Sequence, residues 1–265
     1  MDNFEEFLRA SAEANVIPVI ETMPADLLTP LAVYLKLAED ETESFLLESV
    51  EGGETLARYS FVGVDPWFSI SGNNERLVRR DASGSAVIEM PMIDFLRDHF
   101  QRYRLHERED LPSFAGGAIG SLEFGCAAWF EPSLAKCIEQ SEHEAELMFC
   151  RTIVAFDHAK QLIKIVSLAF VDEANGELEQ LKCVYDSAAS EVLAIRDKLG
   201  SGTLKIPPNA RTTSNFERTS NFRKADFEAA VRSVKEYIAA GDVYQIALSQ
   251  RFLRPTQASA VAIYR

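Results

Sequence analysis

Apolar residues recur at two different spacings along this chain, and the change of spacing divides it. Between residues 16 and 170 they form short runs, many rich in Val, Ile and Phe, as strands do. Thr29 followed by Pro30 is typical of a helix start. The pattern therefore predicts helices at 29–37 and 93–103 and strands at 16–20, 45–49, 56–62, 68–71, 86–89, 153–156 and 162–171.

The last third of the sequence has helical periodicity instead. Apolar side chains three and four residues apart predict a long helix from 178 to Gly200 and a second over 226–240, ended by Gly241. Residues 200–221 between them are rich in Pro, Ser, Thr and Asn, which predicts a surface loop. After Gly241, residues 243–252 are expected to form a strand with one apolar and one half-polar face.

Hairpin strands come before the long helices, which favours an α+β fold with a mainly antiparallel sheet and flanking helices. We expect a first region over 1–200, a polar loop over 201–221, and the start of a second domain over 222–265. No glycine-rich phosphate-binding motif follows a strand, so the sequence gives no support for a nucleotide site. Gly116, Gly117 and Gly120 are expected to permit a close approach of two backbones.

Composition narrows the function further. The 265 residues carry a formal net charge of −14, which argues against a nucleic-acid binder. No apolar run approaches the ~20 residues of a membrane span, and no signal peptide opens the chain, so we expect a cytoplasmic protein. The four cysteines are widely spaced and are expected to be buried free thiols. His143, with acidic neighbours at 142, 144 and 146, is expected to lie on a solvated acidic face.

Several stretches together carry a family resemblance. They are IPVIETMPADLLTPLAVYLKL (17–37), FLLES (45–49), RYSFVG (58–63), PSFAGGAIG (112–120) and KEYIAAGDVYQIALSQRF (235–252). In this order they resemble component I of anthranilate synthase, a family of chorismate-using enzymes. The resemblance implies that chorismate and ammonia are converted to anthranilate and pyruvate, in tryptophan biosynthesis. It further implies Mg²⁺ as cofactor and a glutamine amidotransferase subunit, component II, as partner.

The resemblance also implies a feedback site for L-tryptophan. Glu48 and Ser49 stand where the family builds this site, and a hydroxyl with a carboxylate suits the ligand's ammonium group. Arg58, on the facing strand, is expected to position Glu48 or to lie near the ligand. From residue types alone, a polar edge at the mouth of a hairpin is the simpler interpretation.

Gln245 is the catalytic candidate. The resemblance aligns Gln245 with a lysine that acts as general base in relatives that add water to chorismate. A glutamine amide has no useful basicity, but it can orient an incoming ammonia molecule. The resemblance places the Mg²⁺ ligands beyond residue 265, so these residues alone are expected to be inactive. Residues 121–132 depart from the family pattern, which puts any subunit contact there in doubt.

Two other functions stay open. Component I of aminodeoxychorismate synthase, in the folate pathway, shares this pattern, including glutamine at position 245. A non-catalytic amino-acid-binding module is the alternative from outside the enzymes.

Overall fold

The computed structural model describes residues 3–38, 43–48, 58–138, 141, 143–201, 204 and 218–265. The chain forms two compact units, Met1–Lys205 and Ile206–Arg265. The first unit combines two antiparallel sheets with helices, so the predicted α+β class is confirmed.

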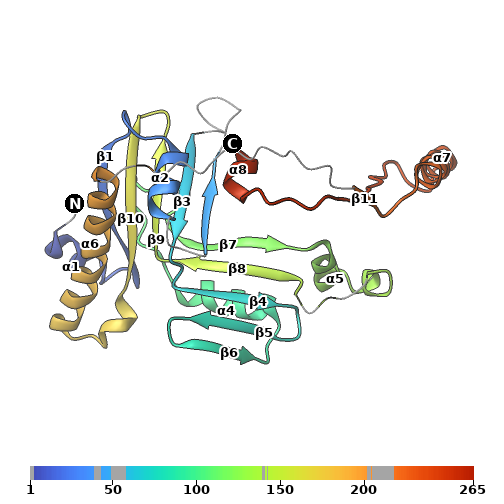
Figure 1. The fold of residues 1–265 in the computed structure, drawn as a ribbon. Coiled ribbons are helices and arrows are strands. Elements are labelled where there is room, and N and C mark those ends of the chain that lie inside the picture. Colours follow the sequence, from blue (N-terminus) through green and yellow to red (C-terminus); the bar gives the residue numbers. More distant parts are fainter. Residues whose placement is uncertain are drawn as a thin grey trace. The chain divides into compact units, whose positions relative to one another are not determined.

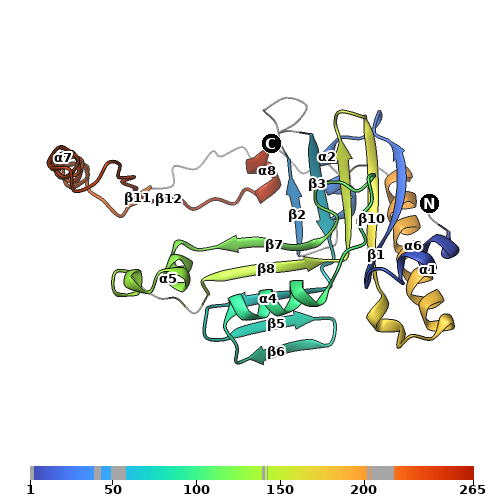
Figure 2. The same ribbon diagram turned by 180° about the vertical axis from the view of Figure 1, so that it is seen from behind.

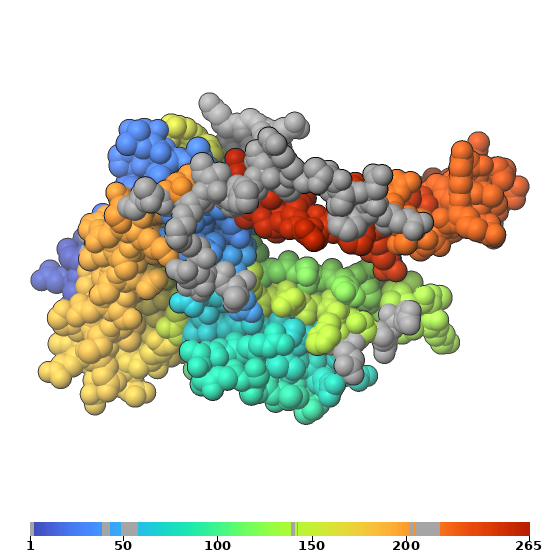
Figure 3. Space-filling view, in the orientation of Figure 1, coloured from blue at the N-terminus to red at the C-terminus, as the bar shows by residue number. Residues whose placement is uncertain are grey.

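The first sheet of this unit, sheet A, has the strand order β1-β10-β9-β3-β2. Its strands are β1 (Val16–Pro24), β2 (Ser44–Leu47), β3 (Tyr59–Val64), β9 (Thr152–Asp157) and β10 (Leu162–Phe170), every neighbouring pair antiparallel. Helices α1 (Phe4–Ala10), α2 (Pro30–Leu37) and α6 (Leu178–Gly200) pack on sheet A (Figure 1). In the space-filling view α6, in orange, forms an outer face of the unit (Figure 3).

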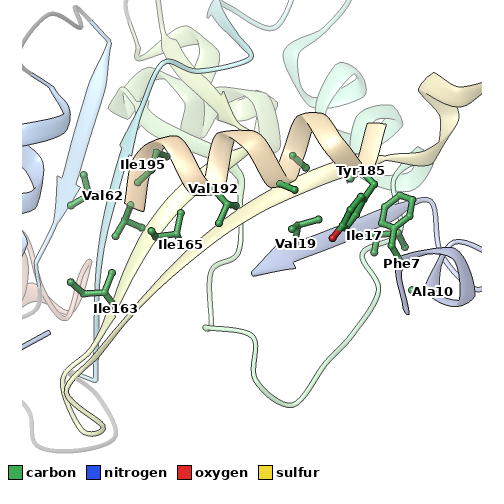
Figure 4. Close-up of a cluster of buried hydrophobic side chains, with 14 of the residues drawn as sticks. Phe7, Ala10, Ile17, Val19, Val62, Ile163, Ile165, Tyr185, Val192 and Ile195 are labelled. Atoms are coloured by element: carbon green, nitrogen blue, oxygen red, sulfur yellow. The ribbon is translucent and has the colours of Figure 1, made fainter. Parts of the chain in front are cut away.

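The main hydrophobic core lies between α6 and sheet A. Val192 of α6 is fully buried, as are Ile163 and Ile165 of β10. At the other end of the helix Tyr185 packs against Phe7 of α1, with ring centroids 5.4 Å apart (Figure 4). The apolar stripe read from residues 178–200 is therefore the face that α6 buries.

The second sheet, sheet B, runs crosswise to sheet A and has the order β6-β5-β4-β8-β7 (Figures 1 and 2). Its strands are β4 (Phe68–Gly72), β5 (Leu77–Asp81), β6 (Gly84–Ile88), β7 (Gly117–Leu122) and β8 (Ala145–Cys150). Helix α4 (Met92–Arg102) covers one face. Short helical turns occupy η1 (Phe124–Cys126), α5 (Ala127–Phe130), η2 (Pro132–Lys136) and, after β10, η3 (Val171–Ala174).

A bent two-stranded ribbon joins the two sheets. In sheet A, β3 pairs with β9; in sheet B, their direct continuations β4 and β8 pair with each other. Between the pairs Val62↔Val154 and Phe68↔Phe149, the strand that contains β3 and β4 advances six residues, whereas the strand that contains β8 and β9 advances five. This extra residue is the device by which strands turn a corner between sheets, and we call this place the ribbon corner.

The second unit contains β11 (Thr219–Ser220), α7 (Lys224–Ala240), β12 (Phe252–Leu253) and α8 (Ala260–Tyr264). Gly241 ends α7 in the left-handed conformation, with φ of 83°, as predicted. The predicted strand over 243–252 is wrong: only Phe252 is in β12, which pairs with β11. Within the described part of the chain, residues 243–251 have no neighbouring strand to complete a ladder.

Most predicted elements of the first unit are confirmed within a few residues, but α1, β5, β7 and β8 were not predicted. The expectation of four buried thiols is half wrong, because Cys126 and Cys150 are buried while Cys137 and Cys183 are exposed. The solvated acidic face around His143 is also wrong in part. Glu144 is only 4% exposed, and its carboxylate accepts hydrogen bonds from Trp129 Nε1 at 2.7 Å and the Ser141 amide at 3.3 Å.

The close approach predicted for the glycines is confirmed at two positions. A Cβ at Gly120 would lie 1.9 Å from the carbonyl oxygen of Glu146 on β8. Gly116 has a φ of 141°, and a Cβ there would lie 3.0 Å from the carbonyl oxygen of Cys150 and 2.5 Å from Leu168 Cδ1. At Gly117 the prediction is wrong, because the nearest atom to a Cβ, Phe100 Cε1, would lie 3.7 Å away.

Candidate functional site

Two of the candidate residues lie at the same end of the hairpin formed by β2 and β3. Glu48 follows the last residue of β2, and Arg58 precedes the first residue of β3. Since Leu47 pairs with Phe61 in the antiparallel ladder, both side chains belong to the same end of the hairpin. Ser49 lies outside the described residues, as does the rest of the connection over 49–57.

Arg58 is fixed by a buried carboxylate of the neighbouring strand β9. Its Nε donates to Asp157 Oδ1 at 3.1 Å and its Nη2 donates to Asp157 Oδ2 at 2.6 Å, which is a bidentate pair. The Asp157 side chain is only 1% exposed, whereas that of Arg58 is 35% exposed. The guanidinium group is therefore anchored on its inner side while part of it still reaches solvent.

The pair shifts the pKa of both groups. Burial alone would raise the pKa of Asp157, but the hydrogen bonds from Arg58 and from the Lys160 amide outweigh it, so this pKa is lowered. The hydrogen bond to Asp157 raises the pKa of Arg58. Both groups are thus held in their charged forms.

A second polar contact lies beside this pair. The Ser60 hydroxyl, which is fully buried, lies 2.7 Å from His158 Nε2. Arg58 also lies over the ring of Tyr59, 4.8 Å from its centroid. The start of β3 and the end of β9 therefore form a polar cluster in which the Arg58 guanidinium group still reaches solvent.

Asp157 is the residue that sequence reasoning missed. The available signal was weak: an aspartate at the end of an apolar strand looks like an ordinary turn residue. Its partner is 99 residues away in the chain, and Asp157 faces the start of β3 only because Tyr59 pairs with it in the ladder.

Gln245 belongs to the second unit and is exposed. The contacts near it hold the neighbouring backbone: Gln250 Nε2 donates to the Ser220 hydroxyl at 2.8 Å, and the Arg251 amide donates to Asn221 Oδ1 at 2.8 Å. Glu48 and Arg58 thus lie together in the first unit, whereas Gln245 is on a separate unit.

The described residues offer no group of three or more His, Cys, Asp or Glu side chains arranged to hold a metal ion. The described residues therefore do not fit a Mg²⁺ site.

Comparison with known proteins identifies the family of the chain. The family model described as chorismate binding enzyme matches residues 42–265. The chain belongs to the chorismate binding enzyme family. This membership confirms the resemblance read from the motifs.

Curated relatives within the family are named as anthranilate synthase component 1. The chain is 33% identical over 257 residues to the probable component 1 of Schizosaccharomyces pombe, covering 96% of this chain and 48% of that protein. It is 34% identical over 262 residues to the protein of Saccharomyces cerevisiae (95% and 48%) and 30% identical over 269 residues to that of Bacillus subtilis (99% and 52%). The chain thus spans about half the length of these relatives.

A solved structure agrees on the fold. Anthranilate synthase component I from Streptococcus pneumoniae TIGR4 superposes with a TM-score of 0.56 and 23% identity, over 92% of this chain and 51% of that one. Separately, none of the described helices combines the length and apolar character that a membrane crossing requires.

Proposed function

We propose that this chain is the N-terminal part of an anthranilate synthase component I. The complete enzyme converts chorismate and ammonia to anthranilate and pyruvate in tryptophan biosynthesis, in the cytoplasm and with Mg²⁺. Component II, a glutamine amidotransferase, supplies the ammonia. The observation that carries the proposal is the family match over residues 42–265, joined to relatives of this name along nearly the whole chain.

The distribution of charge supports the proposal. Residues 206–265 contain nine basic and five acidic side chains, a net charge of +4, although the whole chain carries −14. The first 205 residues therefore carry −18. A dianion such as chorismate is attracted to the second unit and repelled by the first, in accord with Gln245 as a substrate-side residue.

Within the proposed reaction Gln245 orients ammonia by hydrogen bonding and does not act as a base. Glu48, Ser49 and Arg58 are proposed to form part of a feedback site for L-tryptophan. In this site Glu48 offsets the ammonium charge and Ser49 hydrogen-bonds to it. Asp157, by anchoring Arg58, holds that guanidinium group at the start of β3.

The reaction is tested with a protein of the relatives' full length that contains this sequence. With chorismate, Mg²⁺ and ammonium ions we expect anthranilate and pyruvate, identified by mass spectrometry. Aminodeoxychorismate as the product would assign the chain to the folate pathway instead. Binding of L-tryptophan with no turnover of chorismate would favour a non-catalytic module. Residues 1–265 alone are proposed to be inactive, and the same assay tests this.

The feedback site is tested by Ser49→Phe in the same full-length protein. We expect tryptophan inhibition to be lost with little change in turnover, because the larger side chain fills the place of the ligand. Ser44→Ala, five residues earlier at the start of β2, serves as the control. Unchanged inhibition in Ser49→Phe would remove Ser49 from the site.

A further inference from the structure

A pocket of about 310 Å³ opens between α6 and the ribbon corner. This is roughly twice the volume of a cavity that holds benzene. The corner contributes Asp65 and Trp67, and α6 contributes Ser187 and Glu191, while the end of β10 also lines the pocket. All of these residues belong to the first unit.

The pocket has an excess of negative charge. Asp65 and Glu191 both line it, and neither has an ion-pair partner among the residues that the structure describes. Burial raises the pKa of Glu191, and the negative charge of Asp65 raises it further. Both residues are exposed at the rim of the pocket, their like charges interact, and a cation between them would relieve that repulsion.

The one guanidinium group in the lining has a charge partner, although its Nε is buried with no hydrogen-bond partner among the described residues. Arg151 forms a bidentate ion pair with Glu173. Its guanidinium carbon lies 3.9 Å from the Trp67 ring centroid and 4.7 Å from that of Phe170. Because Glu173 offsets the charge of Arg151, the pocket keeps the net negative charge of Asp65 and Glu191, which disfavours an anion.

The remaining lining suits an organic molecule better than a metal ion. The Thr152 and Ser167 hydroxyls lie 2.9 Å apart, and only one of them donates to the other, so the pair keeps a hydrogen for a ligand. Leu168, Val184 and Ile195 supply an apolar wall. A divalent ion would need more carboxylate ligands, and the described residues contain no such group of three.

We propose that this pocket binds a small organic cation: a primary amine on a short apolar or aromatic body. Asp65 and Glu191 are its counter-charges, and the apolar wall takes the body. Asp65 is well placed for this role because its backbone is left-handed, with φ of 49°, and Pro66 follows it, so the turn holds the carboxylate with little freedom. Arg58 lies at the opposite end of β3, seven residues away and thus about 20 Å distant, so the two sites are separate.

The proposal is tested on the 265-residue chain by calorimetry with three isosteric probes: phenethylamine, 2-phenylethanol and phenylacetate. We expect saturable binding of phenethylamine and much weaker binding of the neutral and anionic probes. The double variant Asp65→Asn/Glu191→Gln should bind phenethylamine about tenfold more weakly, a loss of about 1.4 kcal/mol. Asn is a fair replacement at position 65, because it tolerates the left-handed backbone.

Two further variants make the test specific. Glu179→Gln removes an exposed carboxylate of α6 outside the pocket, and phenethylamine affinity should not change. Ser187→Leu fills the pocket from its exposed rim, and binding should be lost while circular dichroism shows an intact fold. The proposal is overturned if phenethylamine does not bind, if phenylacetate or 2-phenylethanol binds as tightly, or if the double variant binds like the wild type.

Discussion

Arg58 and Asp157 form a bidentate pair across β3 and β9, with hydrogen bonds of 3.1 and 2.6 Å between side chains 99 residues apart. The carboxylate is buried and the guanidinium group is partly exposed. The pair therefore links the candidate effector residues to the centre of sheet A.

Asp157→Asn should lower the free energy of unfolding by about 1–2 kcal/mol at pH 7, because a buried charge-assisted pair is lost but Arg58 can still be solvated. The pKa of Asp157 is lowered in the folded state, so its contribution is complete above the unfolded value of about 3.9 and is lost as the pH falls through the folded pKa. Urea unfolding at pH 7 and pH 3 measures both effects. Asp94→Asn, which breaks an exposed pair with Arg97, is the control and should cost little.

His99 gives the first unit a second source of acid sensitivity. Burial lowers its pKa to about 4, and the charges of Arg79 and Arg102 add to the effect. In the unfolded state the His99 ring binds a proton near pH 6.5, whereas in the folded state it does so only near pH 4. The free energy of unfolding is therefore highest above pH 6.5 and decreases as the pH falls towards 4. Linkage alone would give about 3 kcal/mol, and screening of the partly exposed ring reduces this, so His99→Phe should remove about 2 kcal/mol of this loss. Unfolding measured from pH 7 to pH 4 tests it.

Gly120→Ala should destabilise the first unit by about 3 kcal/mol or more, because the added Cβ meets the backbone oxygen of Glu146 and cannot be relieved by a rotamer change. Gly200→Ala is the matched control. Its Cβ would meet no atom within 4 Å, and at the end of α6 it should be neutral or stabilise by about 0.5–1 kcal/mol. Equal unfolding free energies of the two variants would contradict the close approach of β7 to β8.

The four thiols should separate into two classes with a thiol reagent such as DTNB. Cys137 and Cys183 are exposed and should react quickly at pH 8. Cys126 and Cys150 are buried, and burial raises the pKa of Cys150 to about 12, so these two should react only after unfolding. The double variant Cys137→Ser/Cys183→Ser should lack the fast phase. Fast reaction of all four thiols would show that Cys126 and Cys150 are accessible to the reagent in the folded protein.

Gln245→Lys, made in a protein of the relatives' full length, should lower anthranilate formation by about tenfold or more, since a charged lysine cannot orient ammonia in the same way. Lysine can instead activate water, so a hydroxylated product should appear. Chromatography of the products, with Gln257→Lys at an exposed position as the control, measures the ratio. An unchanged ratio of anthranilate to hydroxylated product would show that Gln245 does not decide between ammonia and water as the nucleophile.

The sequence predicts well those elements whose stability is local. The helix start at Thr29, the apolar stripe of α6 and the left-handed Gly241 depend on residues a few positions apart. Strand β5 was missed because Arg79 and Arg80 interrupt its apolar pattern, and Arg79 is accommodated by stacking on the ring of Phe68. Only the completed sheet explains why such a segment is a strand.

The candidate site shows the same division. Motifs were enough to select Glu48 and Arg58, which the hairpin does bring to one end. The anchor at Asp157 depends on the pairing of β3 with β9, which no local pattern specifies. The strand expected over 243–252 failed for the corresponding reason: alternation describes a segment that is able to pair, and a strand exists only where a partner is present.

The ribbon corner has a mechanical consequence for the first unit. Only residues 65–67 separate β3 from β4, and only Arg151 separates β8 from β9, so fraying of either sheet pulls directly on the hydrogen bonds of the other. The two sheets should therefore open together as one cooperative unit. Amide hydrogen exchange should show Val62 and Val154 in sheet A exchanging with the same opening free energy as Ile70 and Leu147 in sheet B.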